Sequence, residues 1–330
     1  MKAKTIIVTL AAVATLVTCG CSRPAEKVAQ GASRTAVLGS FSADSAYKYI
    51  GEQVAIGPRV PGTAEHDSCS NYIIRKLLEF GADTMLVQRG TVTAFDGTRL
   101  PLTNIVAGYN PEARTRVLLA AHYDTRPWAD RDPNPANHTR PIPGANDGAS
   151  GVGVLLEIAR NLQMRRPDVG IDLAFIDCED YGNNDTSEVD DGWCLGSKYW
   201  MAHRAPYYAE NRPRYGILLD MVGGRDARFH YEYFSQLNAQ TPTVKVWSEA
   251  EALGYADVFV RTLGGAVNDD HIVLTNAGIP TTDIIECSNA ITGTFPPTWH
   301  TMADNMDNID PETLKAVGQT VLNVVYKERP

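Results

Sequence analysis

Acidic and histidine side chains occur in five short motifs that are spread along the chain. Carboxylates and imidazoles bind zinc and transfer protons in enzymes, so these motifs indicate one site for metal and acid-base chemistry. One such motif can arise by chance, but five of them, most at the end of an apolar run, are hard to explain as scattered surface charge. The residues are His122 and Asp124, Asp147, Glu179 and Asp180, Asp220, and His300.

Short apolar runs lead into these motifs. They are nearly continuous hydrophobic stretches, which is the pattern of strands covered on both faces in a parallel sheet. The runs are residues 117–121 before His122, residues 171–176 before Glu179 and Asp180, and residues 217–219 before Asp220. Because ligands in open α/β sheets bind outside the carboxyl ends of the strands, we expect these residues to share one crevice. Asp147 is predicted at the same rim, where a helix over residues 148–162 begins.

Length and composition are those of one enzyme-sized globular domain. The chain has 330 residues, of which 44% are hydrophobic and 21% are charged, and this balance is unlike that of a disordered protein. The formal net charge is -9 and no basic run is present, so we expect no nucleic acid as a partner. The predicted fold is α/β: a single-domain, three-layer α/β/α structure whose central, mostly parallel mixed twisted sheet is flanked by helices.

The first residues resemble an export signal. Lys2 and Lys4 precede the apolar stretch 6–17, which is too short for a comfortable membrane span. The stretch runs into Cys19 and Cys21, and this segment resembles a bacterial lipoprotein box. The sequence does not decide which of the two cysteines is the lipidation site.

These observations predict three regions. Residues 1–20 are expected to be a lipoprotein-type signal peptide, residues 21–40 a flexible tether, and residues 41–330 the catalytic domain. The mature protein is then exported to the bacterial cell envelope or periplasm, with a membrane contact only through the N-terminal lipid anchor. Plain secretion after a small-residue cleavage site is the alternative.

Four cysteines follow the predicted signal: Cys69, Cys178, Cys194 and Cys287. An exported protein permits disulfides, and four cysteines allow three full pairings, which the sequence leaves open. Their spacing is not that of a zinc cluster. Cys69 lies on the apolar stripe of a predicted helix, and core packing or a disulfide is favoured over a nucleophilic role for Cys178.

The remaining segments predict elements around the site. Residues 103–108 and 117–121 are predicted to be neighbouring strands joined by a short turn. Two long loops cover residues 125–146, with five prolines, and residues 181–195, and loops of this length are usually functional. The chain closes with a helix that Asp310 is expected to cap.

Taken together, the motifs resemble the zinc-dependent aminopeptidase family and, within it, the glutaminyl cyclases. The resemblance extends over residues 55–326. Both branches share the His-x-Asp, Gly-Ala-x-Asp, paired-acid and final histidine motifs, so these motifs cannot separate a peptidase from a cyclase. Three features resemble the cyclases: Trp299 before the final histidine, Asp269 where aminopeptidases usually have serine, and Gly196 with Ser197 after a loop that carries aromatic residues.

Two residues depart from this pattern. Asp180 replaces the second member of the usual Glu-Glu pair, and Asp283 stands where animal cyclases have a histidine. Such replacements resemble a bacterial subgroup of cyclases.

The resemblance implies one zinc ion per chain, bound by Asp147, Asp180 and His300. Three protein ligands and one open position are the arrangement of a catalytic zinc site. Asp147 has a structural alternative, because it could also serve as the N-cap of the helix that follows it.

The resemblance also implies the reaction. The α-amine of an N-terminal glutamine in a peptide or protein attacks its own γ-carbonyl group, ammonia leaves, and a pyroglutamate ring remains. Glu179 would transfer the proton as general acid and base. Trp193, Phe295 and Trp299 are expected to form the walls of the substrate pocket that folds the glutamine side chain toward its amine.

His122 and Asp220 leave a second possibility open. In the peptidases, the residues that match them hold a second zinc ion together with the match of Asp147. We expect Asp220 and Asp269 to act in catalysis and to share a proton, which makes Asp220 a poor metal ligand and His122 a relic of a second metal site. The alternatives are a two-metal zinc aminopeptidase and a non-catalytic, peptide-binding lipoprotein.

Overall fold

The computed structural model describes residues 39–184, 192–203 and 211–330. The predicted export signal and both candidate lipidation residues, Cys19 and Cys21, lie outside these ranges. The predicted tether lies outside them too, apart from its last two residues. Among the helices of the described ranges, none has both the length and the apolar character needed to cross a membrane.

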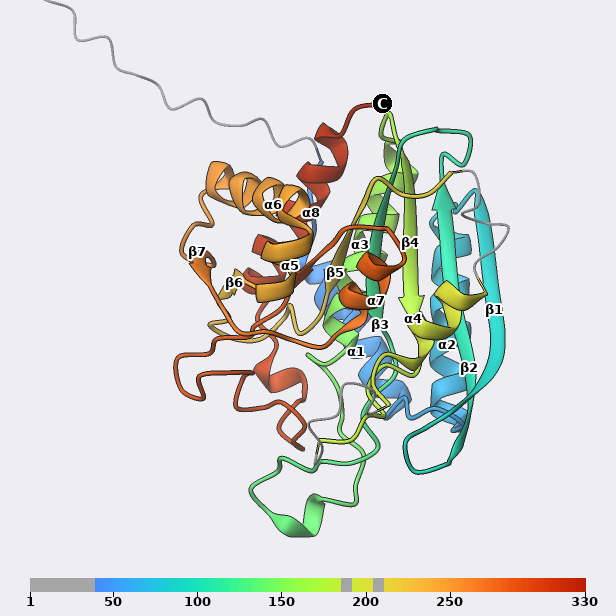
Figure 1. Ribbon diagram of the computed structural model, residues 1–330, viewed down its shortest axis with the longest axis vertical. Coiled ribbons are helices and arrows are strands. Elements are labelled where there is room, and N and C mark those ends of the chain that lie inside the picture. Colours follow the sequence, from blue (N-terminus) through green and yellow to red (C-terminus); the bar gives the residue numbers. More distant parts are fainter. Residues whose placement is uncertain (1–38, 185–191, 204–210) are drawn as a thin grey trace, which may run out of the picture. The chain divides into compact units, whose positions relative to one another are not determined.

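A six-stranded mixed sheet forms the centre of the described chain (Figure 1). Its strand order is β1-β2-β4-β3-β5-β8, in which β2 runs antiparallel to both of its neighbours and the last four strands are parallel. The strands are β1 (Thr84–Thr93), β2 (Arg99–Tyr109), β3 (Arg116–His122), β4 (Gly170–Ile176), β5 (Tyr215–Leu219) and β8 (Thr281–Ile284). A separate pair consists of β6 (Phe229–Tyr231) and β7 (Phe259–Leu263).

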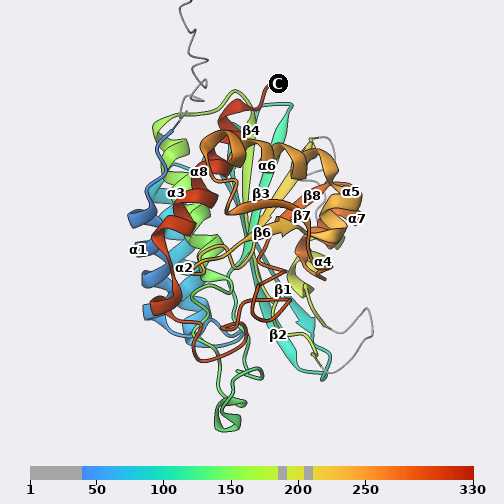
Figure 2. The ribbon, with the colours of Figure 1, turned by 90° about the vertical axis from the view of Figure 1, so that its left-hand side faces the viewer.

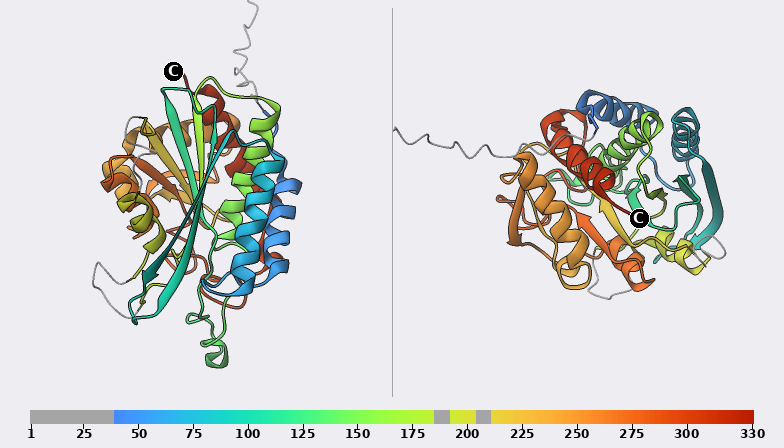
Figure 3. Two further views of the ribbon diagram at one scale, coloured as in Figure 1. Left: turned by 90° about the vertical axis from the view of Figure 1, so that its right-hand side faces the viewer. Right: turned by 90° about the horizontal axis from the view of Figure 1, so that it is seen from above.

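Helices cover both faces of the six-stranded sheet (Figures 2 and 3). α1, α2, α3 and α8 pack on one face, α4 and α7 pack on the other, and α6 contacts α8, β7 and β8. This is the predicted three-layer arrangement. The helices are α1 (Ala43–Ile56), α2 (Ala64–Glu79), α3 (Ala149–Met164), α4 (Leu195–Ala202), α5 (Tyr233–Asn238), α6 (Gln240–Leu253), α7 (Asp270–Asn276) and α8 (Pro311–Lys327), with short 3-10 turns at Pro135–Asn137 and Met306–Asn308.

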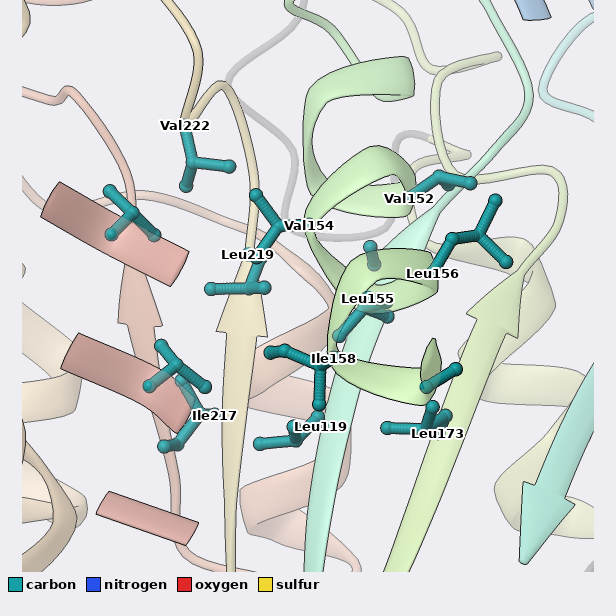
Figure 4. Close-up of a cluster of buried hydrophobic side chains, with 14 of the residues drawn as sticks. Leu119, Val152, Val154, Leu155, Leu156, Ile158, Leu173, Ile217, Leu219 and Val222 are labelled. Atoms are coloured by element: carbon teal, nitrogen blue, oxygen red, sulfur yellow. The ribbon is translucent and has the colours of Figure 1, made fainter. Parts of the chain in front are cut away.

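The three apolar runs predicted to be covered strands are confirmed as β3, β4 and β5, and every residue of these strands is buried. Alternate side chains enter different cores. Leu119 faces the core under α3, while Leu118 faces the core under α4 and α7. Figure 4 shows Leu155 and Ile158 of α3 beside β3, the strand that carries Leu119. Complete burial of one such side chain contributes roughly 1.5–3 kcal/mol to the free energy of folding.

The start of α3 approaches the sheet closely at two glycines. A Cβ atom at Gly151 would lie 2.2 Å from the carbonyl oxygen of Leu219, and one at Gly148 would lie 2.5 Å from that of His122. Both distances are far below van der Waals contact, so only glycine allows the helix to pack against the ends of β3 and β5. The packing places Asp147, the residue before Gly148, beside these strand ends.

Residues 103–108 and 117–121 lie in β2 and β3, and the prediction that these strands are neighbours is wrong. β4 lies between them and pairs with both. The apolar pattern shows that a strand is covered on both faces, but it does not show which strand lies at its edge. Inserting β4, whose faces are buried, satisfies its backbone hydrogen bonds on both edges.

Two helix predictions are confirmed by the structure. Cys69 is buried on the inner face of α2. Asp310 is the N-cap of α8, and its carboxylate accepts hydrogen bonds from the backbone N–H groups of Glu312 and Thr313. The four cysteines of the described ranges, Cys69 among them, are buried free thiols, which settles the open question of their pairing in this structure.

Candidate active site

Five chain segments bring the predicted residues to one edge of the sheet. His122 ends β3, Glu179 and Asp180 follow β4, and Asp220 follows β5, as their position after the apolar runs predicts. These strand ends surround a cavity of about 240 Å³. Its lining includes Asp147, Glu179, Asp180, Asp220, Asp269 and His300, together with the predicted wall residues Trp193, Phe295 and Trp299.

Asp147, Asp180 and His300 form a buried group of possible metal ligands, with one ligand atom from each residue within 4.8 Å of the other two. Nε2 of His300 lies 3.2 Å from Oδ1 of Asp180 and 3.7 Å from Oδ2 of Asp147. Both carboxylate oxygens of Asp180 are buried without a hydrogen-bond donor among the described residues. A buried carboxylate is unfavourable unless a cation balances it, so this group fits a divalent metal ion. Carboxylate oxygens and imidazole nitrogens both bind zinc, and three protein ligands are the number found in catalytic zinc sites.

Asp147 does not cap α3. The N-cap residue is Gly148, and the helix has no side-chain cap. The carboxylate of Asp147 instead lies between two histidines, with Oδ1 at 3.1 Å from Nε2 of His122 and Oδ2 facing His300. Burial would raise the pKa of Asp147, but the contact with His122 outweighs this effect and lowers it.

His300 is held from behind by a pair of residues that the sequence analysis did not identify. Nδ1 of His300 lies 3.4 Å from Oδ1 of Asp130, and the guanidinium group of Arg126 donates to both oxygens of Asp130, at 2.9 and 2.7 Å. Arg126 also donates to the backbone carbonyls of Asp180 and Gly182, so one buried guanidinium group connects two of the ligand segments. Both residues lie in the long loop 125–146, whose length was the only signal in the sequence that could have indicated them.

Two further carboxylates hold the backbone of the ligand segments. Asp124 accepts hydrogen bonds from the N–H groups of Glu179 and Asp180, at 3.0 and 3.1 Å. Asp304 accepts hydrogen bonds from the N–H groups of Asn146 and Asp147, at 2.7 and 3.1 Å. Asp124 is among the motif residues of the sequence analysis. In the structure, Asp124 holds the backbone of Glu179 and Asp180 in place. The role of Asp304 was not predicted.

His122, Asp147 and Asp220 form a second compact group beside the first. Nε2 of His122 lies 3.1 Å from Oδ1 of Asp220, the same distance as from Asp147. Burial raises the pKa of Asp220 to about 7; His122 opposes this, and the charges of Asp147 and Asp269 add to it. Asp220 is therefore less readily ionised than an exposed aspartate, which weakens it as a metal ligand.

The expected pairing of Asp220 with Asp269 differs in detail. Asp269 affects Asp220 through its charge, while one ligand atom each of Asp269, His271 and Asp283 lies within 4.8 Å of the other two. Burial raises the pKa of both Asp269 and Asp283, so these two neighbouring carboxyl groups do not both ionise readily. Asp269 is also the N-cap of α7 and accepts a hydrogen bond from the N–H group of Asp270.

Glu179 lines the cavity and, like Asp269, belongs to neither the His122 group nor the His300 group. Burial and the nearby charge of Asp269 raise its pKa well above the usual value of a carboxyl group. Oε1 of Glu179 accepts a hydrogen bond from the thiol of Cys194 at 3.4 Å. A buried carboxyl group with a raised pKa at the surface of a cavity has the properties of a general acid and base.

Aromatic rings enclose His300 and the cavity. The rings of Trp193 and Trp299 stack on the imidazole of His300, with ring centroids 6.0 and 3.8 Å away, and Phe295 contacts Trp299 at 4.6 Å. The guanidinium group of Arg126 also lies over the ring of Trp193, at 5.0 Å. The structure therefore brings the three predicted wall residues together at one cavity.

Comparison with known proteins places this site in a family. Residues 104–325 match the sequence profile of peptidase family M28. The chain is 50% identical to a glutaminyl cyclase of Bacteroides thetaiotaomicron whose crystal structure contains N-acetylhistamine; the match covers 88% of this chain and 99% of that one, with a TM-score of 0.84. It is also 50% identical to a leucine aminopeptidase precursor of Bacteroides thetaiotaomicron, over 88% of this chain and 98% of that one, with a TM-score of 0.82.

A more distant relative is the glutaminyl-peptide cyclotransferase of Bos taurus, which is 25% identical over 280 residues, or 78% of this chain and 74% of that protein. Cyclases therefore occur among both the similar and the distant relatives. The chain belongs to peptidase family M28 and, within that family, to the bacterial glutaminyl cyclases.

Proposed function

We propose that the protein converts N-terminal glutamine residues of peptides and proteins to pyroglutamate, with release of ammonia. The observation that carries this proposal is the position of Glu179, a buried acid with a raised pKa that lies beside the group of Asp147, Asp180 and His300 in a small, aromatic-walled cavity. The similarity to glutaminyl cyclases supports the same reaction.

Asp147, Asp180 and His300 would hold one zinc ion per chain. Bound zinc would polarise the γ-carbonyl group of the substrate and stabilise the negative charge that develops on its oxygen. The carboxylate of Asp180, whose buried oxygens accept no hydrogen bond from the described residues although Arg126 lies 3.7 Å from Oδ1, and the arrangement of Asp130 behind His300 support this assignment. A carboxylate behind a ligating histidine is a common way to orient the ring and to increase its basicity.

Glu179 moves the proton in this mechanism. The neutral α-amine attacks the γ-carbonyl carbon of the same residue, and Glu179 accepts one proton from the attacking nitrogen. As the new carbon–nitrogen bond forms and the bond to the side-chain nitrogen breaks, Glu179 returns the proton to the departing nitrogen, which leaves as ammonia. Proton transfer by a positioned group typically accelerates a reaction by about 10²- to 10⁴-fold.

Asp269 and Asp220 complete the acidic part of the cavity. Asp269 lines the cavity near Glu179 and is proposed to orient the departing nitrogen. Asp220 is proposed to stay partly protonated next to His122 at neutral pH, which weakens the affinity of this second group for a metal ion.

The aromatic walls determine the shape of the substrate. Both the nucleophile and the leaving group belong to one glutamine residue, so the cavity has to hold that side chain bent toward its own amine. Trp193, Phe295 and Trp299 form such walls, and their rings exclude water from the reacting atoms.

A two-metal aminopeptidase is the second candidate function. His122, Asp147 and Asp220 are close enough to hold another ion, and one relative of 50% identity is named as an aminopeptidase precursor. Mass spectrometry of a peptide that begins with glutamine separates the possibilities. Loss of ammonia alone supports the cyclase, loss of the complete glutamine residue supports the peptidase, and an unchanged peptide supports a binding protein.

We propose from the sequence that the protein is exported and lipid-anchored through Cys19 or Cys21. Incorporation of a labelled fatty acid in a bacterial host should be lost when the correct one of these cysteines is replaced by serine. Labelling that persists in both single variants and in the double variant would contradict the proposal.

A further inference from the structure

Cys194 lies directly behind the proposed general acid and base. It is the N-cap residue of α4, it is buried, and its backbone has the left-handed conformation, with φ at 56°. Its N–H group donates to the carbonyl oxygen of Glu179 at 3.0 Å, and its thiol donates to Oε1 of the same residue at 3.4 Å. Cys194 therefore forms hydrogen bonds with both the backbone and the side chain of Glu179.

The environment keeps the thiol in the form that can donate. Burial raises the pKa of Cys194 well above its ordinary value, and the negative charges of Glu179, Asp270 and Asp269 raise it further. A protonated thiol is a weak hydrogen-bond donor, and a buried carboxylate is a good acceptor. The thiol lies within 4.8 Å of Glu179 and Asp269 and is not part of the group of Asp147, Asp180 and His300.

We propose that Cys194 is a positioning residue for Glu179 in the cyclisation reaction, which makes this inference dependent on the proposed function. The thiol binds Oε1, keeps its own proton throughout, and leaves Oε2 for the two nitrogen atoms of the substrate. It fixes the rotamer of Glu179, because a carboxyl group that exchanges one proton between two nitrogens has to keep one orientation in both steps.

Cys178, the residue before Glu179, provides a matched control for the loss of a buried thiol near Glu179. It is also buried, is also left-handed, with φ at 52°, and precedes Glu179 directly in the chain. Its thiol, however, is directed to the carbonyl oxygen of Pro101 at 3.7 Å and not to Glu179. Replacing Cys178 by alanine therefore measures the effect on kcat of a small cavity near Glu179, while the hydrogen bond from Cys194 to Glu179 is kept.

The test compares steady-state kinetics of Cys194→Ala, Cys194→Ser and Cys178→Ala on a peptide that begins with glutamine. Cys194→Ala should lower kcat about fivefold, the size expected for one hydrogen bond, with KM within twofold and zinc content unchanged. Cys194→Ser, which restores an O–H donor, should recover at least half of the kcat. Cys178→Ala should retain the wild-type kcat.

A double-mutant comparison shows whether Cys194 acts through Glu179. In a Glu179→Gln background, Cys194→Ala should have little further effect, because the group that it positions no longer transfers a proton. Equal losses of kcat in both backgrounds, equal losses in Cys194→Ala and Cys178→Ala, or a serine variant as slow as the alanine variant would each overturn the proposal. A wild-type protein that forms no pyroglutamate would instead contradict the proposed function.

Discussion

Oδ1 of Asp130 lies 3.4 Å from Nδ1 of His300, and this contact directs the other ring nitrogen, Nε2, toward Asp180. Burial opposes ionisation of Asp130, but contacts with His300 and Arg126 outweigh it and lower the pKa of Asp130. The side-chain amide of Asn184 also contacts Nδ1, at 3.2 Å, so an ion pair and an amide outside the ligand group orient this proposed metal ligand.

Replacing this carboxylate should weaken zinc binding. Asp130→Ala should raise the zinc Kd about 10- to 100-fold, because Nδ1 of His300 loses its carboxylate partner and keeps only the side-chain amide of Asn184. Competition between the metal-free protein and a fluorescent chelator measures this change. Asp168→Ala is a suitable control, because Asp168 is an exposed acid that pairs with the surface residue Arg329. Equal Kd values for the two variants would show that Asp130 does not support the metal group.

Glu179→Gln should separate catalysis from metal binding. The substitution removes proton transfer and changes the side-chain volume very little, so zinc content and fold should persist while kcat falls at least about 100-fold. Metal analysis and single-turnover kinetics measure the two properties independently. A kcat within threefold of that of the wild type would show that another group transfers the proton.

Asp269→Ser should change both the reaction and the metal stoichiometry. Cyclisation should fall about 100-fold, because an acid that orients the departing nitrogen is lost. The charge of Asp269 contributes to the raised pKa of Asp220, so its removal should favour ionised Asp220 at neutral pH. Titration calorimetry of the metal-free protein should therefore detect one zinc ion in the wild type and a second, weaker one in the variant. Two tightly bound ions in the wild type would favour the aminopeptidase.

Glu232 should make folding sensitive to acid. Burial would raise its pKa, but His271, at 3.1 Å, and the backbone N–H groups of Phe234 and Ser235 lower it to about 2. A lowered pKa in the folded state stabilises the protein above the ordinary value of 4.5, and this contribution disappears as the pH falls toward 2.

Glu232→Gln should therefore lower the free energy of unfolding at pH 7 by up to roughly 3 kcal/mol, and by progressively less as the solution becomes more acidic. Urea unfolding of the metal-free wild type and variant at neutral and acidic pH measures the difference. A difference that stays constant over this range would mean that Glu232 acts by packing and not by its charge.

The strand ends could be predicted from the sequence because two independent patterns coincide there. A covered parallel strand is apolar on both faces, and polar residues directly after it must lie at the carboxyl edge of the sheet. This reasoning correctly placed His122, Glu179, Asp180 and Asp220 around one site. The resemblance to a known family then indicated Asp147 and His300, which the structure brings together in one buried group.

The support of the site could not be predicted in the same way. Arg126 and Asp130 lie in a loop without periodicity. Cys194 contacts Glu179 across two chain turns, in which Cys178 and Cys194 have the left-handed backbone conformation. Such contacts depend on exact distances between loops, which no local pattern encodes. The incorrect pairing of residues 103–108 with residues 117–121 has a related cause. The strand that lies between them, β4, follows both of them in the sequence.

Gly148 and Gly151 contribute no side chain, yet they set the dimensions of the site. Each faces a carbonyl oxygen at a distance that no carbon atom can occupy, so any other residue would push the start of α3 away from the sheet and carry Asp147 with it. In a library of random variants, these two positions should be as intolerant of exchange as the acids themselves. A search for functional residues that considers only reactive groups would pass over both of them.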